Sequence, residues 1–200
     1  MDTDTHWPFD TYLDKLYLKF PNQLSYYYFK NGFSEEECDT IVNTFVPQCT
    51  DDAQIMGDHV IPIRRTKICW IPRNSSTNWI YDRLVEISEN ANENAFKFDL
   101  TGIRDKIQFA LYEATDNGHY DKHVDLGAGD IYACRKLSLC VQLSSPDDYT
   151  GGELKTSHGI LPSNKGAVSV FSSFLTHEVM PVTTGKRYSL VLWIYGPPFR

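Results

Sequence analysis

The sequence lacks the features that mark several common classes of protein. Its five cysteines form no Cys-x-x-Cys pair, which argues against a zinc ribbon or a thioredoxin-type redox site. The net charge of −7 argues against an extended nucleic-acid surface, because phosphate binding needs a basic footprint. No apolar run approaches the roughly 18 residues of a transmembrane helix, so we expect no membrane partner.

The amino terminus also lacks a recognisable targeting signal. Residues 1–5 are acidic and polar, without the apolar stretch of a secretory signal. We therefore expect a cytoplasmic protein with reduced, mostly buried cysteines. What the chain does have is an aromatic content of 14%, which favours a β-rich fold with a well-filled interior.

The first half of the chain combines strand and helix signals. Residues 26–29 and 64–71 are predicted strands, and residues 1–25 are expected to wrap the body. Ser34, followed three residues later by Glu37, has the capping-box pattern that begins a helix. A second helix is predicted from Ser75 or Ser76 to about residue 90, with Trp79, Ile80, Leu84 and Ile87 on one face.

The second half carries short strands separated by turn residues, which is typical of a sandwich or barrel. The predicted strands are residues 107–113, 119–125, 136–143, 167–171, 176–182 and 187–195. Helices followed by strands indicate an α+β, mainly β, fold. With no internal repeat or linker, we expect one domain over residues 1–200: supporting elements in 1–104 and a strand-rich core in 105–200, which could form an antiparallel barrel or a jelly roll.

Three residues carry the strongest functional signal. His123 and Asp125 form a His-x-Asp pair, and His177 follows 52 residues later. Alternate residues of a strand point to one face, so His123 and Asp125 can reach one ion, with Val124 turned to the opposite layer. Two imidazoles and one carboxylate leave positions open on a metal, as non-haem Fe(II) oxygenases require. The alternatives are a polar surface strand for the pair and a buried core histidine for His177.

Several motifs together resemble a known family over roughly residues 105–196. They are Tyr112, Tyr120-Asp121-Lys122-His123-Val124-Asp125, Gly151-Gly152-Glu153-Leu154, His177-Glu178-Val179 and Gly185-Lys186-Arg187-Tyr188-Ser189-Leu190. They resemble the Fe(II)/2-oxoglutarate dioxygenases, and within these the prolyl 4-hydroxylase-like group. The resemblance implies a double-stranded β-helix with supporting helices on one sheet.

The resemblance also implies roles for individual residues. His123, Asp125 and His177 would be the catalytic Fe(II) ligands, and Arg187 would anchor the C5 carboxylate of 2-oxoglutarate, with Tyr112 and Ser189 as further contacts. Some relatives place a second tyrosine on the strand that corresponds to residues 136–143. This strand has none, so Ser138 or Gln142 is expected to take that role.

The resemblance implies hydroxylation of an unactivated C–H bond, with release of succinate and CO₂ and ascorbate as a possible reductant. The expected substrate is a prolyl residue in a peptide or protein. Tyr132 and Arg135, in or beside a glycine-containing loop at 126–134, and Trp193 are candidate substrate contacts. Two alternatives stay open: hydroxylation of another amino-acid side chain, a free amino acid or a small molecule, and a non-enzymatic jelly-roll or cupin-like binding module. The sequence does not indicate an oligomeric state.

Overall fold

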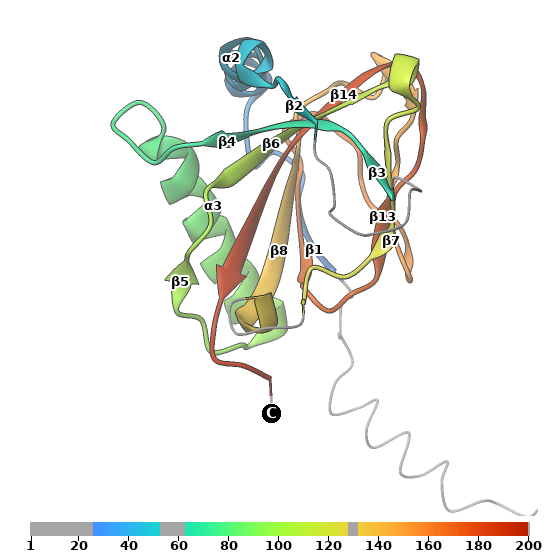
Figure 1. Cartoon of the computed structure of the whole chain (residues 1–200). Coiled ribbons are helices and arrows are strands. Elements are labelled where there is room, and N and C mark those ends of the chain that lie inside the picture. Colours follow the sequence, from blue (N-terminus) through green and yellow to red (C-terminus); the bar gives the residue numbers. More distant parts are fainter. Residues whose placement is uncertain (1–25, 53–62, 128–131, 200) are drawn as a thin grey trace, which may run out of the picture.

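Two antiparallel sheets form the body of the protein, and helices cover the outer face of the larger one (Figure 1). The computed structural model describes residues 26–52, 63–127 and 132–199. The predicted N-terminal wrap and the middle of the glycine-containing loop predicted at 126–134 therefore lie outside the described residues. No helix among the described residues is long and apolar enough to span a bilayer.

The larger sheet has nine strands in the described part of the chain. Its path runs through β1 (Tyr26–Phe29), β12 (Val168–Ser172), β8 (Arg135–Gln142), β14 (Val182–Tyr195), β6 (Ile107–Glu113), β4 (Lys67–Ile71) and β2 (Asp51–Asp52). Two further strands pair with β14, namely β5 (Gly102–Ile103) and β9 (Tyr149–Gly151).

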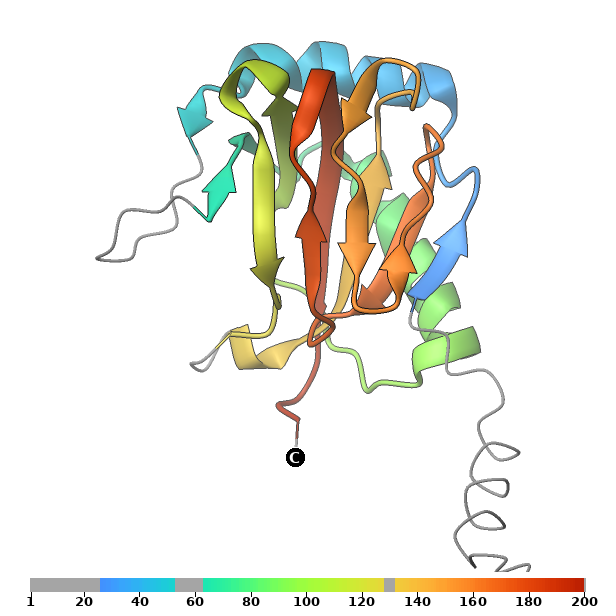
Figure 2. The same ribbon diagram turned by 90° about the vertical axis from the view of Figure 1, so that its right-hand side faces the viewer.

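The smaller sheet has five strands in the described residues and faces the larger one across the site discussed below (Figure 2). Its order is β11 (Gly159–Ile160), β10 (Leu154–Thr156), β13 (His177–Val179), β7 (His119–His123) and β3 (Arg64–Arg65). The prediction of a mainly β jelly roll with supporting helices is thus confirmed.

The first helix, α2 (Glu35–Phe45), begins as its sequence predicts. The Ser34 hydroxyl accepts a hydrogen bond from the Glu37 backbone, and the Glu37 carboxylate accepts one from the Ser34 backbone at 2.8 Å. This exchange satisfies two backbone donors that the first helical turn leaves unpaired. Its buried side chains, Cys38, Ile41 and Phe45, join the main core.

The second helix, α3 (Asn78–Ala91), begins later than predicted. Ser76 donates its hydroxyl hydrogen to the side chain of Asn74 and belongs to a turn ahead of the helix. Thr77 is the N-cap residue, and its buried hydroxyl donates to the carbonyl of Pro72 at 2.5 Å. The prediction of Ser75 or Ser76 as the first helical residue was wrong, because both serines lie in the turn before the helix and Ser76 is bound there to Asn74.

Strand β6 shows how the larger sheet separates core from site. Its bounds are those predicted, Ile107–Glu113. Ile107, Phe109 and Leu111 belong to the main core beneath the helices. The alternate residues Gln108 and Tyr112 line a cavity on the other face, between the two sheets.

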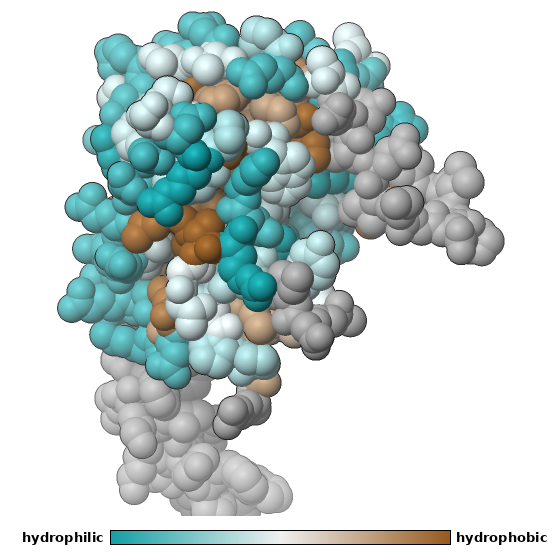
Figure 3. Space-filling model, turned by 60° about the vertical axis from the view of Figure 1, so that its left-hand side comes forward, coloured by the Kyte–Doolittle hydropathy of each residue, from teal (hydrophilic) through white to brown (hydrophobic). Residues whose placement is uncertain are grey.

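Outside the sheets, hydrophilic side chains cover most of the face shown in Figure 3, with apolar patches among them.

Three strand predictions needed correction. The predicted strand at 176–182 ends at Val179 as β13, and Val182 begins β14, which runs to Tyr195 without the predicted break before residue 187. Residues 64–71 form two strands in different sheets, because the chain crosses between them at Thr66, whose hydroxyl donates to the Leu111 carbonyl at 2.8 Å. Strand β7 ends at His123, so Asp125 follows the strand rather than belonging to it. The Asp125 backbone N–H donates to the Ser173 carbonyl at 2.9 Å. Val124 is 43% exposed and borders the cavity, so its predicted place in the opposite layer was wrong.

No disulfide joins any of the five cysteines, all of which lie in the described part of the chain. Cys38, Cys49 and Cys69 are buried, and Cys134 and Cys140 are half-buried. The burial of three of the five agrees with the prediction that the cysteines are mostly buried.

Candidate active site

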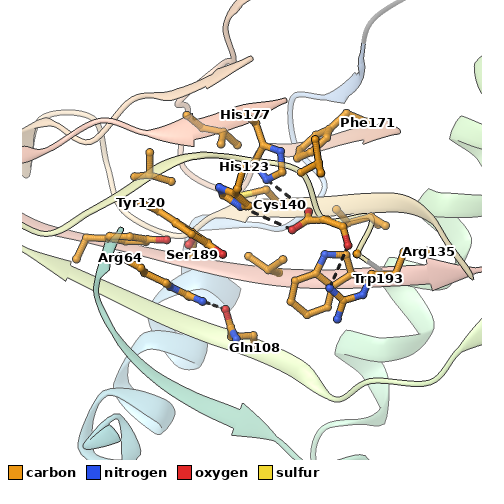
Figure 4. A pocket seen from close by; sticks show the side chains of 18 of the residues that line it. Arg64, Gln108, Tyr120, His123, Arg135, Cys140, Phe171, His177, Ser189 and Trp193 are labelled. Atoms are coloured by element: carbon orange, nitrogen blue, oxygen red, sulfur yellow. Dashed lines mark hydrogen bonds and ion pairs between the residues drawn. The ribbon is translucent and has the colours of Figure 1, made fainter. Parts of the chain in front are cut away.

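Three side chains that are remote in sequence converge between the sheets (Figure 4). His123 ends β7 and lies opposite His177, the first residue of the adjacent strand β13. Asp125 lies two residues after His123 in the sequence, just beyond the end of β7. One ligand atom of each residue lies within 4.8 Å of the others. Nε2 of His123 is 3.7 Å from one Asp125 carboxylate oxygen, and Nε2 of His177 is 3.4 Å from the other.

Backbone carbonyl groups orient both imidazoles. Nδ1 of His123 lies 2.7 Å from the carbonyl oxygen of Asp121, and Nδ1 of His177 lies 2.9 Å from that of Leu175. A carbonyl oxygen only accepts, so each Nδ1 carries the ring hydrogen and each Nε2 lone pair is available at the centre. Burial and the neighbouring His177 lower the pKa of His123 to about 4, so this ring is neutral at pH 7.

The Asp125 carboxylate is held by its own hydrogen bond. The Ser138 hydroxyl, on β8, donates to Asp125 Oδ2 at 2.7 Å and lies 3.0 Å from the Ser173 hydroxyl. The structure therefore places Ser138 beside the proposed metal ligand. It does not place Ser138 beside Arg187, where we expected a second carboxylate contact.

Arg187 is a buried cation without an anionic partner among the described residues. Its side chain comes from β14, and the residue is only 2% exposed. One guanidinium nitrogen lies 3.4 Å from the Ser189 hydroxyl, and its Cζ lies 5.4 Å from the Tyr112 ring centroid. A buried guanidinium without a counter-charge is costly. The pocket is therefore suited to an external carboxylate, which the planar guanidinium group of Arg187 can bind through two parallel N–H donors.

A cavity of about 470 Å³ joins the three convergent side chains to Arg187. Of the site residues predicted from the sequence, nine line it and Ser138 and Gln142 do not; the nine are Tyr112, His123, Asp125, Tyr132, Arg135, His177, Arg187, Ser189 and Trp193. Arg135 donates to Asp105 at 2.6 Å, and its guanidinium Cζ lies 3.8 Å from the Trp193 ring centroid. These contacts fix one wall of the cavity.

Sequence reasoning missed three residues near the site. Tyr149, on β9, is buried, and its hydroxyl accepts from the Gln142 amide at 2.9 Å. Burial raises the pKa of Tyr149, while the nearby Arg187 guanidinium opposes that shift. Arg64 and Gln108 line the cavity and pair with each other at 2.7 Å. No local motif marks these residues, because sheet pairing brings them to the site.

Comparisons with known proteins agree with this geometry. Residues 107–195 match the model of the 2OG-Fe(II) oxygenase superfamily. A PKHD-type hydroxylase of Synechococcus elongatus is 30% identical over 130 residues, which are 60% of this chain and 57% of the relative. A PKHD-type hydroxylase of Hyphomonas neptunium is 38% identical over 84 residues, which are 38% of this chain and 37% of the relative. The chain thus spans about half or less of the length of these relatives.

Solved structures show the same fold at low sequence identity. A prolyl-4-hydroxylase of Pseudomonas putida is 19% identical with a TM-score of 0.67, covering 92% of this chain and 99% of that one. A Trichoplax adhaerens prolyl hydroxylase, in complex with a peptide fragment of the hypoxia inducible factor oxygen degradation domain, is 19% identical. Its TM-score is 0.68, and the match covers 96% of this chain and 94% of that one.

Proposed function

Because residues 107–195 match the 2OG-Fe(II) oxygenase superfamily model and the cavity carries a fitting set of side chains, we propose that the chain is an Fe(II)- and 2-oxoglutarate-dependent dioxygenase. The reaction is hydroxylation of an unactivated C–H bond, coupled to conversion of 2-oxoglutarate and O₂ into succinate and CO₂. The observation that carries the proposal is one cavity holding both a two-histidine, one-carboxylate cluster and a buried guanidinium without a partner carboxylate in the described chain.

The residues of the cavity fit the two groups that this activity needs. His123, Asp125 and His177 offer the ligand set of a facial Fe(II) site. When bound, the iron supplies the activation of O₂. Arg187 binds the C5 carboxylate of 2-oxoglutarate through paired N–H donors. Ser189 supports Arg187 from the same strand face, and the buried Tyr112 walls the pocket beside the guanidinium.

The proposed substrate is a prolyl residue in a peptide or protein. The names of the similar proteins support a hydroxylase of this kind. The cavity wall built by Tyr132, Arg135 and Trp193 presents aromatic surface, against which a compact apolar ring packs favourably. Tyr132 is 51% exposed and therefore lies where a macromolecular substrate has access.

Anaerobic spectroscopy tests the activity before any substrate is known. Adding Fe(II) and 2-oxoglutarate is expected to give a weak visible charge-transfer band. His177→Ala is expected to abolish the band, whereas the exposed His158→Ala control keeps it. Arg187→Met is expected to weaken 2-oxoglutarate binding at least tenfold, because a buried charge-assisted contact is lost, while Fe(II) binding persists. A wild-type protein that gives no band contradicts the proposal.

Turnover then tests the substrate. Prolyl peptides are incubated with the loaded enzyme and O₂, and succinate is measured together with the mass of the peptide. The proposal expects a gain of one oxygen atom on a proline-containing fragment. Oxygen gain on another amino-acid side chain, or on small molecules alone, would contradict the prolyl assignment and leave the oxygenase assignment intact.

A further inference from the structure

Arg64 is a cavity arginine that has no role in the proposed reaction. Arg64 comes from β3, at the edge of the smaller sheet, and lines the same cavity as the metal cluster. Its guanidinium Cζ lies 4.7 Å from the Tyr120 ring centroid, and the Tyr120 ring stacks on the His123 ring at a centroid distance of 3.6 Å. Arg64 is thus one aromatic ring away from a proposed iron ligand, as Figure 4 shows.

Arg64 has no anionic partner among the residues that the structure describes. Its terminal nitrogen donates to the neutral amide oxygen of Gln108 at 2.7 Å. Its Nε is buried and has no hydrogen-bond partner in the described structure. By contrast, the half-buried Arg83 pairs with Glu37 at 3.0 Å, and Arg135 pairs with Asp105 at 2.6 Å.

A second donor of the cavity is also without a partner. The indole Nε1 of Trp193 is buried and has no acceptor among the described residues. Trp193 lines the cavity together with Arg64 and Gln108. Buried donors are normally paired, so two unpaired donors beside one cavity indicate that an acceptor-bearing ligand belongs there.

Charge counting points to the same kind of ligand. Apart from the paired Arg135, the charged residues that line the cavity within the described part of the chain are Arg64, Asp125 and Arg187. In the loaded state, Fe(II) and Arg187 would balance Asp125 and the two carboxylates of 2-oxoglutarate. The charge of Arg64 would then remain, in a site of low dielectric where an uncompensated cation is costly. One further anion would therefore make the loaded cavity electrically neutral.

We propose that Arg64 binds a carboxylate of the substrate and thereby selects for acidic substrates. This inference rests on the proposed function, and it makes Arg64 a specificity residue separate from the 2-oxoglutarate anchor Arg187. Trp193 donates its indole hydrogen to the same substrate and covers its apolar part. The carboxylate is either that of a free amino acid or that of an acidic residue beside the reacting one in a peptide.

Binding to a form that cannot turn over tests the proposal. The protein is loaded with Zn(II) and 2-oxoglutarate and titrated calorimetrically with two sets of matched probes. One set pairs free amino acids, including L-proline, with their primary amides. The other pairs prolyl peptides flanked by Asp or Glu with their Asn or Gln counterparts. We expect the carboxylate member to bind at least tenfold more tightly in one of the sets, which identifies the source of the carboxylate.

Variants then assign the preference to Arg64. Arg64→Met is expected to remove it, and Arg64→Lys, which keeps a positive charge, is expected to retain part of it. Arg65→Met is the matched control, because the neighbouring exposed Arg65 contacts only the carbonyl of Asp116 among the hydrogen bonds described. The affinity for 2-oxoglutarate is expected to stay within about twofold in all three variants.

The outcomes separate this inference from the proposed function. Failure of the wild-type Zn(II) protein to bind 2-oxoglutarate overturns the proposed function and this inference with it. Normal 2-oxoglutarate binding without carboxylate preference in either set overturns only the role of Arg64. A loss of 2-oxoglutarate affinity in Arg64→Met that matches the loss in Arg187→Met also overturns it, because Arg64 would then belong to the cosubstrate site.

Discussion

The hydroxyl of Ser138 donates a 2.7 Å hydrogen bond to the carboxylate of Asp125, a proposed iron ligand. Partners of this kind orient a ligand, and their loss typically lowers metal affinity 10- to 100-fold. We expect Ser138→Ala to weaken Fe(II) binding by about tenfold, measured by anaerobic titration. Ser157→Ala, a change on the exposed surface, should leave it unaltered. Equal affinities in the two variants would show that Asp125 does not depend on Ser138.

Tyr149 is expected to contribute to 2-oxoglutarate binding. Its hydroxyl receives a hydrogen from Gln142 and lies near Arg187, so both neighbours are donors. The phenolic hydrogen therefore needs an acceptor, and a carboxylate on Arg187 would provide one. We expect Tyr149→Phe to raise the Kd for 2-oxoglutarate about three- to tenfold, in line with the loss of one hydrogen bond.

Tyr188→Phe is the matched control for this experiment. Tyr188 is next to Arg187 in β14 but packs on the core face, with its ring centroid 6.0 Å from that of Phe109. Calorimetry with Zn(II)-loaded protein measures both Kd values without turnover. A Tyr149→Phe protein that binds 2-oxoglutarate like wild type would remove Tyr149 from the cosubstrate site.

Much of the fold follows from local sequence signals. Strand β6 and the cap of α2 have the predicted residues because alternation and capping act over a few positions. The convergence of His123 and His177 was predictable only through the family motifs, since strands remote in sequence must pair to bring them together. Arg64 and Tyr149 escaped prediction for the same reason, because neither lies in a motif and both reach the site through strand pairing.

The ion pairs of Glu113 are expected to stabilise the protein at neutral pH, and this stabilisation is expected to be lost in acid. Its carboxylate pairs with Lys186 at 2.7 Å and with Lys67 at 2.5 Å, and its side chain is 11% exposed. The hydrogen bond from Lys186, followed by that from Lys67, lowers the pKa of Glu113. The unfolded chain therefore takes up a proton at higher pH than the folded one. The stabilisation is present above a pH of about 4.3, the ordinary value, and is lost as pH falls through the lowered pKa.

Glu113→Gln tests this dependence. We expect the variant to unfold with a free energy about 1 kcal/mol below wild type at pH 7, and the difference to shrink as the pH is lowered below about 4. Urea unfolding at several pH values measures both quantities. Glu89→Gln, on the exposed face of α3, should show no such pattern. A difference that does not change with pH would show that the ion pairs of Glu113 are not its source.

Tyr81 joins α3 to the larger sheet through two hydrogen bonds. Its buried hydroxyl donates to the carbonyl of Ile71 at 2.6 Å and accepts from the backbone N–H of Ile107 at 3.0 Å. Ile71 and Ile107 are register partners in the β4–β6 pair, so the hydroxyl satisfies two main-chain groups at the end of that ladder. Tyr81→Phe would leave both groups buried and unpaired.

Each unpaired buried group costs about 1–3 kcal/mol, so for the two groups we expect Tyr81→Phe to lower the free energy of unfolding by about 2–6 kcal/mol. Urea unfolding measures this loss, and the dependence of the free energy of unfolding on urea concentration is expected to stay unchanged. Tyr28→Phe is the control, since the Tyr28 hydroxyl donates to Asn164 in an exposed position and its loss should cost less than about 1 kcal/mol. If the two variants lose equal stability, then water replaces the Tyr81 hydroxyl and the helix is held to the sheet by apolar packing alone.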